Sequence, residues 1–304
     1  IAPDARVFED AAWPEAYRGR AGVLASGMAR AEHMLQAAPY PASSPMLAKL
    51  AAHEASARGM KAPFDRLKIA VNFEDRVNEA GIFQPACNNC GDCVSGCNVG
   101  AKNTLIMNYL PDAKAHGAEI FTELGVRHLE RTSGGVWRVV VQSMAHDHHG
   151  SGPSSGATGS GDGIRAGSEF GIEAGMVIVA AGTLGSTEIL LRSREHGLPL
   201  SDRLGEGFSG NGDVLGFAFN TDEAIDGIGV GPHLEKGTPG PCITGIIDLR
   251  GTDQLEDGMI IEEGVVPSSL TPIMAASLTA ASATLGVHQK HSVRQSLGKL
   301  LQDL

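Results

Sequence analysis

Apolar positions recur with a helical period in the first sixty residues of the chain. Residues 19–38 carry apolar side chains at roughly helical spacing, which predicts an amphipathic helix. Residues 44–59 predict a second helix, with Ser43 or Ser44 as its N-cap and Gly59 as its stop.

The pattern changes to strands after residue 118. A short helix is predicted before this point, from about Lys102 to Tyr109. Strands are predicted over residues 119–124, 126–131, 136–142 and 169–173. Residues 176–182 are an apolar run that ends in glycine, which predicts a buried strand, and a helix over residues 184–195 follows directly.

The last third of the chain combines short apolar runs with glycine-rich loops. Strands are predicted over residues 213–219, 242–249 and 258–263, and a helix from about Ser292. Residues 146–168 are rich in Gly and Ser, which predicts a long flexible loop between two strands. Isolated helices among runs of strands predict an α+β fold with α/β character rather than regular βαβ repeats.

Composition and charge argue against two classes of protein. The 304 residues include 24 Lys and Arg against 35 Asp and Glu, a formal net charge of −11, which argues against a nucleic-acid partner. The 40 glycines indicate tight turns and close backbone approaches rather than a helical bundle. The uncharged stretch 264–287 is long enough to cross a bilayer, but its prolines and hydroxyl side chains favour a buried wall over a transmembrane segment.

Four of the five cysteines fall within eleven residues, at Cys87, Cys90, Cys93 and Cys97. They are too close together to staple distant segments, which indicates a reducing compartment. Their spacing is that of a bacterial ferredoxin run, so one hypothesis is an iron–sulfur cluster such as 4Fe–4S. Asn98 replaces the usual proline, and no second run occurs. Zinc, local disulfides and free thiols that stiffen the loop are the alternatives, and Cys242 is expected to be a buried apolar residue.

Histidines offer weaker candidates. The group His146, His148 and His149 could hold a metal, but histidines on a low-complexity loop usually face solvent. Three others are expected to be packed or surface residues rather than catalytic ones: His33, His53 and His128.

The segment around Gly182 carries the clearest chemical signal. A strand that ends in glycine lets the backbone approach a ligand, and the helix that follows presents free N–H groups and a positive dipole end. Thr183 or Ser186 could cap that helix. The arrangement suits a pyrophosphate, although many α/β proteins use the same turn for packing. The glycines of residues 227–231 follow no predicted strand and are expected to form a loop.

Three segments together resemble the glucose–methanol–choline (GMC) family of flavin oxidoreductases, in its cholesterol-oxidase-like branch. They are residues 100–110 (GAKNTLIMNYL), 180–192 (AAGTLGSTEILLR) and 204–213 (LGEGFSGNGD). The second is similar to the family's second signature, and their order and spacing agree with the family over most of the chain. The four-cysteine loop occurs in a sub-branch related to the steroid oxidases. The resemblance implies part of a Rossmann-like FAD-binding domain and a mixed-sheet substrate domain.

The resemblance also divides the chain into parts. Residues 1–100 would form the helical and cysteine-loop region that covers FAD and substrate, residues 101–212 part of the FAD-binding domain, and residues 213–304 an incomplete substrate domain. The family's GxGxxG segment and its C-terminal catalytic His do not occur in this sequence. We therefore expect an internal fragment of a longer protein that binds FAD poorly by itself.

The resemblance implies contacts to FAD at three places. Val126 would contact the adenine through its backbone, and Ala181 and Gly182 would lie near the dinucleotide. The residues expected near the flavin end of the cavity are Asn211, Gly212 and Asp213.

The implied reaction is oxidation of an alcohol, with a sterol as a candidate substrate. A base takes the hydroxyl proton while the hydride passes to the flavin, which oxygen or another acceptor reoxidises. The cholesterol-oxidase branch also has an active-site Glu that shuttles a proton during double-bond isomerisation. Glu262 and Glu263 fall in that place, and Glu262 is preferred. One of the two should face inward on an alternating strand, unless both are solvated at its end.

Two functions from other classes compete with this interpretation. The cysteines alone suggest an iron–sulfur electron-transfer module, and the fold alone would also suit a non-catalytic binding protein. The sequence predicts a bacterial cytoplasmic protein, with peripheral contact to a membrane as a further expectation.

Overall fold

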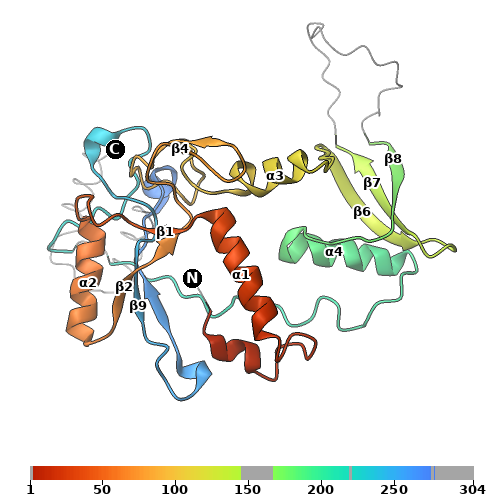
Figure 1. The fold of residues 1–304 in the computed structure, drawn as a ribbon, viewed down its shortest axis with the longest axis horizontal. Coiled ribbons are helices and arrows are strands. Elements are labelled where there is room, and N and C mark those ends of the chain that lie inside the picture. Colours follow the sequence, from red (N-terminus) through yellow and green to blue (C-terminus); the bar gives the residue numbers. More distant parts are fainter. Residues whose placement is uncertain (1–2, 145–166, 219–220, 275–276, 278–304) are drawn as a thin grey trace, which may run out of the picture. The chain divides into compact units, whose positions relative to one another are not determined.

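The computed structural model describes residues 3–144, 167–218, 221–274 and 277 (Figure 1). Contacts divide the chain into two units. Unit 1 combines Ile1–Ala118 with Phe217–Leu304, and unit 2 is Glu119–Gly216. The two units are defined by contacts alone and carry no functional assignment. The division into three functional parts expected from the sequence therefore stays a prediction.

The α-helices in the described part of unit 1 are α1 (Ala21–Leu35), α2 (Ala48–Met60) and α3 (Tyr109–Ala115). Short 3-10 turns occur at Ala5–Glu9, Leu105–Met107, Leu234–Lys236, Leu255–Asp257 and Ser268–Leu270. The two predicted N-terminal helices are therefore present, whereas the third predicted helix is split into a 3-10 turn and α3.

The ends of α2 differ from the prediction. The helix begins after Leu47, which gives no side-chain cap, so Ser43 and Ser44 lie too far before its first turn to cap it. It continues past Gly59 to Met60, and its C-cap is Lys61, which takes a left-handed conformation with φ of 55°. The expected serine cap and glycine stop are both wrong.

The main sheet of unit 1 has the order β10–β9–β2, and all its pairs are antiparallel. Its strands are β2 (Phe64–Arg66), β9 (Gly245–Asp248) and β10 (Ile260–Glu262). Two small antiparallel pairs join β1 (Ala38–Pro39) to β3 (Lys68–Ile69) and β4 (Arg76–Val77) to β5 (Phe83–Gln84).

The core of unit 1 lies where α2 packs on β9. Tyr40, Leu47 and Leu50 are buried together, and Phe64 and Phe73 pack against them. The Tyr40 and Phe73 rings meet edge to face, with centroids 5.7 Å apart. This cluster brings α2 against the sheet whose last strand carries Glu262.

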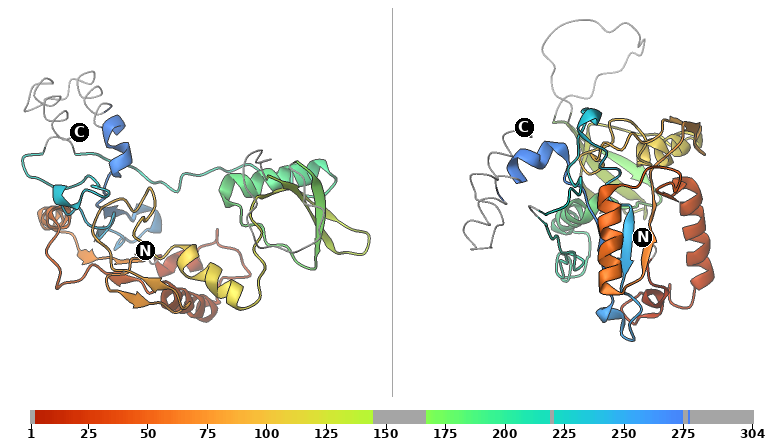
Figure 2. Two further views of the ribbon diagram at one scale, coloured as in Figure 1. Left: turned by 90° about the horizontal axis from the view of Figure 1, so that it is seen from above. Right: turned by 90° about the vertical axis from the view of Figure 1, so that its left-hand side faces the viewer.

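Unit 2 is a three-stranded meander with one helix packed on it (Figure 2). The strands are β6 (Leu124–Arg131), β7 (Trp137–Ser143) and β8 (Glu169–Ala174), joined antiparallel in the order β6–β7–β8. The helix α4 (Gly182–Glu195) packs against β6 through Ile189 and Ser193, which are both buried.

Three predicted strands are wrong. Of the expected strand over residues 119–124, only Leu124 is in a strand, as the first residue of β6. Residues 176–180 pair with no strand of the described chain, and the side chains of Met176 and Ile178 are 78% and 82% exposed. Residues 213–218 also form no strand, and Val214 is 91% exposed. The last two segments have apolar strand-like sequences, but a strand needs a neighbour to take its backbone hydrogen bonds, and the described residues supply none.

The mixed helix-and-sheet composition confirms the predicted α+β class. Among the described residues, no helix combines the length and the apolar character needed to cross a membrane. Several expectations lie outside the described residues: the helix from Ser292, most of the 146–168 loop with its three histidines, and the second half of the 264–287 stretch.

Candidate functional site

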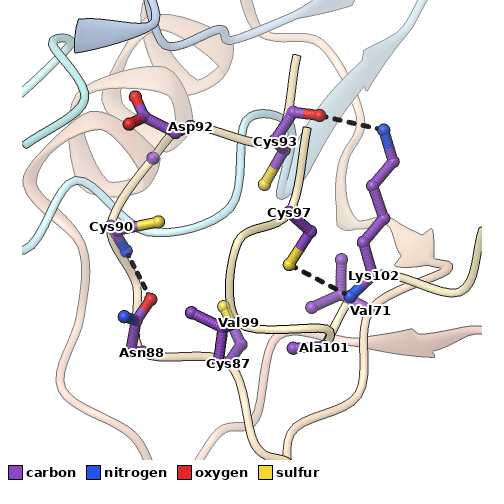
Figure 3. Close-up of a pocket in the computed structure, with 11 residues that line it drawn as sticks. Val71, Cys87, Asn88, Cys90, Asp92, Cys93, Cys97, Val99, Ala101 and Lys102 are labelled. Carbon is purple, nitrogen blue, oxygen red and sulfur yellow. Dashed lines mark hydrogen bonds between the residues drawn. The ribbon is translucent and has the colours of Figure 1, made fainter. Parts of the chain in front are cut away.

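The four clustered cysteines line one small cavity in unit 1 (Figure 3). Val71, Asp92, Val99, Ala101 and Lys102 contribute to the rest of its wall. The thiols are free and half-buried, so the loop contains no disulfide. The chain thus brings together all four cysteines that the sequence singled out.

Backbone and side-chain hydrogen bonds fix this loop in place. The backbone N–H groups of Asn89 and Lys102 donate to the Cys87 and Cys97 sulfurs, each at 3.4 Å. The Lys102 ammonium donates to the Cys93 carbonyl oxygen at 2.9 Å. These contacts hold the sulfurs around the cavity.

A buried amide supports the start of the same loop. Asn72 is fully buried, and its Nδ2 donates to the carbonyl oxygens of Gln84 and Pro85, both at 3.0 Å. The Asn72 backbone carbonyl oxygen accepts from the Cys87 N–H at 2.9 Å. Because these bonds join Asn72 to the segment that leads into the loop and to Cys87, they fix the path of the chain there.

Burial decides the protonation of the two most enclosed thiols. It raises the pKa of Cys87 to about 11, and neighbouring thiols add to the shift. Burial also raises the pKa of Cys93. Both thiols are therefore protonated at neutral pH, whereas a metal ligand must be a thiolate. Within the described ranges, no group of three or more His, Cys, Asp or Glu side chains is arranged to hold a metal ion. The metal assignment of the cysteines stays a prediction.

Asp92 joins the cysteine loop to the segment after β10. Its carboxylate accepts from the Ser268 N–H at 2.8 Å and from the Ser268 hydroxyl at 2.7 Å. A Cβ on Gly229 would overlap the Asp92 carboxylate, and one on Gly231 would lie 3.1 Å from it. The glycines that the sequence assigned to a loop do lie in one, but they also make room for this buried carboxylate.

Glu263 lies in a buried ion pair with Lys49 of α2. The Lys49 Nζ is 2.8 Å from the Glu263 Oε1, and their side chains are 1% and 7% exposed. The same carboxylate accepts from the backbone N–H groups of Thr244 and Gly245, at 2.6 and 2.9 Å, and from the Thr244 hydroxyl. Burial lowers the pKa of Lys49, while the Glu263 charge opposes this shift. All these contacts tie α2 to β9 and to the end of β10.

Glu262 is the last residue of β10 and is half-buried. It lies opposite Ile246 of β9 in the antiparallel ladder. The residue after it, Glu263, is the one that pairs with Lys49.

The Lys49 ammonium also links this ion pair to the cysteine loop. Its Nζ donates to the Cys242 carbonyl oxygen at 3.4 Å. Hydrogen bonding by the Cys242 backbone in turn lowers the pKa of the Cys93 thiol, which opposes the effect of burial. Cys242 itself is half-buried, and its thiol lies 3.7 Å from the Val265 carbonyl oxygen.

The residues expected to contact FAD fall in unit 2. Ala181 is the N-cap of α4 and gives no side-chain cap, and the first turn of the helix contains no acidic residue. Gly182 has φ of 75°, and no atom lies within 4 Å of where its Cβ would be. Thr183 does not cap the helix, and the Ser186 hydroxyl accepts from the Ala181 N–H at 3.0 Å instead. The helix start is exposed and open to an anionic group.

The other two expected contact regions differ in character. Val126 is a half-buried residue of β6, and its carbonyl accepts a hydrogen bond from Arg192 at 3.1 Å. Asn211, Gly212 and Asp213 form an exposed turn, in which Asn211 and Gly212 have φ of 59° and 72°.

The histidines take structural places, as expected. His53 is buried and its Nε2 lies 3.1 Å from the Ile261 carbonyl oxygen. His128 is buried and stacks on His196, with ring centroids 3.7 Å apart. His33 has a side chain that is 70% exposed.

Sequence reasoning missed Lys49, Thr244, Asp92 and Arg192. Lys49 had no signal, because a lysine in an amphipathic helix is normally solvated. The signal for Asp92 was weak and lay in the glycines of residues 227–231. Closely spaced glycines outside any regular element often mark a place where another chain segment approaches.

Comparison with known proteins gives these residues a family context. Residues 78–208 match the GMC oxidoreductase family. This range contains the four-cysteine loop, Val126, Ala181 and Gly182, whereas Glu262, Glu263 and the turn at residues 211–213 lie outside it.

Two relatives are similar to the chain. It is 35% identical over 133 residues to the cholesterol oxidase of Mycobacterium tuberculosis, which covers 41% of this chain and 19% of that protein. It is 27% identical over 237 residues to the cholesterol oxidase of Acinetobacter baumannii, which covers 72% of this chain and 40% of that protein. The chain thus spans less than half the length of these relatives. No solved structure matches it. The matched region, residues 78–208, is thus similar to the GMC oxidoreductase family, and both relatives are cholesterol oxidases.

Proposed function

We propose that the protein is an FAD-dependent oxidoreductase that oxidises a CH–OH group, with a sterol as the preferred substrate class. The observation that carries the proposal is the match of residues 78–208 to the GMC oxidoreductase family. Similarity to two cholesterol oxidases supports the sterol. The chain spans only part of those proteins, so the activity of the complete protein is our inference.

The donor set at the start of α4 fits a dinucleotide. A helix N-terminus without a side-chain cap or an acidic residue leaves its N–H groups and positive dipole end available to an anion. The open space at the Gly182 Cβ position lets a ligand approach the backbone closely. Ala181 and Gly182 would bind the diphosphate, and the Val126 backbone would bind the adenine.

When bound, FAD supplies the acceptor for the substrate hydride. The chain's own contribution at that end would be the turn formed by Asn211, Gly212 and Asp213, which is exposed. Oxygen or another acceptor would then take the electrons.

Glu262 is our candidate for the proton-transfer residue of the substrate domain. Its neighbour Glu263 has a carboxylate engaged by Lys49, Thr244 and Gly245, so a proton on it would break a buried ion pair. Glu262 is half-buried and lies at the strand end. The contacts of Glu263 argue against proton exchange by that residue, and we keep Glu262 as the candidate.

The test uses the full-length gene product that contains this chain. We expect it to bind one FAD per chain and to oxidise cholesterol in detergent faster than a short-chain alcohol. We expect Glu262→Gln to slow double-bond isomerisation of the product by about 100-fold or more while oxidation continues. A protein that binds no flavin, or that oxidises no alcohol, contradicts the proposal.

Electron transfer through an iron–sulfur centre is the second candidate function. Its one supporting observation is that all four clustered thiols line the same cavity. The described residues as arranged do not fit a metal centre, so we derive no step through one. Iron and sulfide analysis of anaerobically purified protein tests this second function. Two or more irons per chain that are lost in Cys90→Ser would favour an iron–sulfur centre.

We place the protein in the bacterial cytoplasm, with contact to a membrane surface where a sterol is taken up. The support is that all five thiols are free, as in a reducing compartment.

A further inference from the structure

A β-bulge in the edge strand β6 lies where one side chain of α4 donates hydrogen bonds to the strand backbone. The register of β6 against β7 shifts between Val126 and His128, so Arg127 lies opposite no residue of β7. Such a bulge interrupts the ladder of backbone hydrogen bonds. The Arg192 Nη2 donates to the Val126 carbonyl oxygen at 3.1 Å, and its Nε donates to the Arg127 carbonyl oxygen.

The residues around Arg192 hold it in this position. Glu188, one turn earlier on α4, forms an ion pair with the Arg192 guanidinium. Ser193 is fully buried, and its hydroxyl accepts from the Leu129 N–H at 2.8 Å. Two consecutive residues of α4 thus form hydrogen bonds with the β6 backbone on both sides of the bulge. We name this arrangement of Arg192 and Ser193 on β6 the α4–β6 clasp.

The fork shape of the guanidinium matters here. Nε and Nη2 lie in one plane and reach two successive carbonyl oxygens at once, which a lysine ammonium cannot do with the same geometry. The Arg192 side chain is 23% exposed, so these charge-assisted hydrogen bonds are partly shielded from water.

We propose that Arg192 is a positioning residue of the FAD site, which sets the backbone at Val126 and Arg127 to receive the adenine. This inference rests on the proposed function, in which the Val126 backbone binds the adenine. A carbonyl oxygen has two lone pairs, so acceptance from Arg192 does not by itself prevent the Val126 oxygen from contacting a ligand.

Arg192 acts through β6 and does not touch the diphosphate. It lies ten residues beyond Gly182 along α4, which is about 15 Å at 1.5 Å per residue. Its effect is therefore confined to the adenine end of the site, and the flavin end should not depend on it.

This separation of the two ends defines the experiment. Apoprotein of the full-length gene product is titrated calorimetrically with FAD, with ADP as a probe of the adenine end, and with FMN as a probe of the flavin end. The variants are Arg192→Met, which removes the fork, and Arg192→Lys, which keeps the charge. The matched control is Arg194→Met on the same helix, because the Arg194 side chain donates no hydrogen bond to the described part of β6.

We expect Arg192→Met to weaken binding of FAD and ADP by about 10- to 100-fold, the cost of charge-assisted hydrogen bonds, and to leave FMN binding unchanged. Arg192→Lys should weaken ADP binding by less, and Arg194→Met should match the wild type. If Arg192→Met does not fold, unchanged ADP binding in Arg192→Lys overturns the inference.

The remaining outcomes are also decisive. Unchanged ADP affinity in Arg192→Met, or an equal fall in ADP and FMN affinity, overturns the role of Arg192 while the proposed function stands. Wild-type protein that binds no FAD refutes the proposed function itself, and the inference with it.

Discussion

Removal of the Lys49 charge should destabilise the protein more than removal of the charge of an exposed lysine. The Lys49 side chain is 1% exposed, and its ammonium donates to Glu263 at 2.8 Å and to the Thr244 hydroxyl at 3.0 Å. Lys49→Met keeps the apolar length of the side chain but leaves the Glu263 carboxylate buried without its cation. The perturbation is therefore electrostatic rather than steric.

Its magnitude follows from the contacts that remain. Removing one partner of a buried ion pair costs about 3–5 kcal/mol. Glu263 would keep its hydrogen bonds from the Thr244 and Gly245 N–H groups, at 2.6 and 2.9 Å, which favours the lower end of that range. For a unit of this size, about 3 kcal/mol corresponds to a fall in Tm of roughly 6–12 °C.

The assay is urea unfolding of the full-length protein, followed by circular dichroism. The control is Lys68→Met, because Lys68 pairs with Glu32 on the surface, where the two side chains are 64% and 53% exposed. Such an exposed pair contributes at most about 1 kcal/mol. The double variant Lys49→Met with Glu263→Gln should recover part of the loss. If Lys49→Met costs no more than Lys68→Met, the buried pair does not stabilise α2 on the sheet and the reasoning fails.

Three further predictions concern single positions. Gly91→Ala should lower the free energy of unfolding in urea by about 2–4 kcal/mol, because φ is 83° and a Cβ would lie 2.9 Å from the backbone of the neighbouring loop. Its control, Gly27→Ala, lies in open space within α1 and should raise that free energy by about 0.5–1 kcal/mol. Equal effects of the two substitutions would contradict this reasoning. Ser193→Ala should lower the free energy of unfolding by about 1–3 kcal/mol in the same assay, since it leaves the Leu129 N–H of β6 buried without its acceptor. A loss below about 0.5 kcal/mol, as for an ordinary surface substitution, would contradict a stabilising role of the α4–β6 clasp. Because burial raises the pKa of Cys87 to about 11, its thiolate fraction and its alkylation by iodoacetamide should stay low at pH 8.5 and rise toward pH 11, as followed by mass spectrometry; rapid modification at pH 7 would contradict the burial of this thiol.

The sequence predicted local elements well where one segment carries its own pattern. The helix periodicity of α1 and the alternation in β7 and β8 depend on nearby residues, and all three elements occur close to their expected bounds. Residues 176–180 failed for the opposite reason. Their apolar run does predict a strand, but a strand forms only beside a partner, and the described chain offers none.

The candidate site divides in the same way. The four cysteines are close in sequence, and the chain keeps them around one cavity. Partners far apart in sequence could not be foreseen: Lys49 meets Glu263 across 214 positions, and Asp92 meets Ser268 across 176. The Lys49–Glu263 pair leaves no periodic or motif-like trace, and the Asp92–Ser268 pair leaves only the weak signal of the closely spaced glycines. The family resemblance reached the regions that we propose to bind the cofactor, and it gave no information on the ion pair between Lys49 and Glu263.

The β6 bulge was equally out of reach. Residues 126–131 predict a strand by alternation, yet the register shift at Arg127 depends on how Arg192 and Ser193 of α4 meet that strand. Only the packed structure shows why an arginine and a serine stand next to each other there.

The central claim, a flavin enzyme that oxidises an alcohol, is tested most directly by the visible absorption of the full-length gene product under anaerobic conditions. We predict flavin bands near roughly 370 and 450 nm that bleach when cholesterol is added, because the substrate hydride reduces the bound flavin. A protein that shows no flavin band even after FAD is added, or flavin bands that neither cholesterol nor a simple alcohol bleaches, would contradict it.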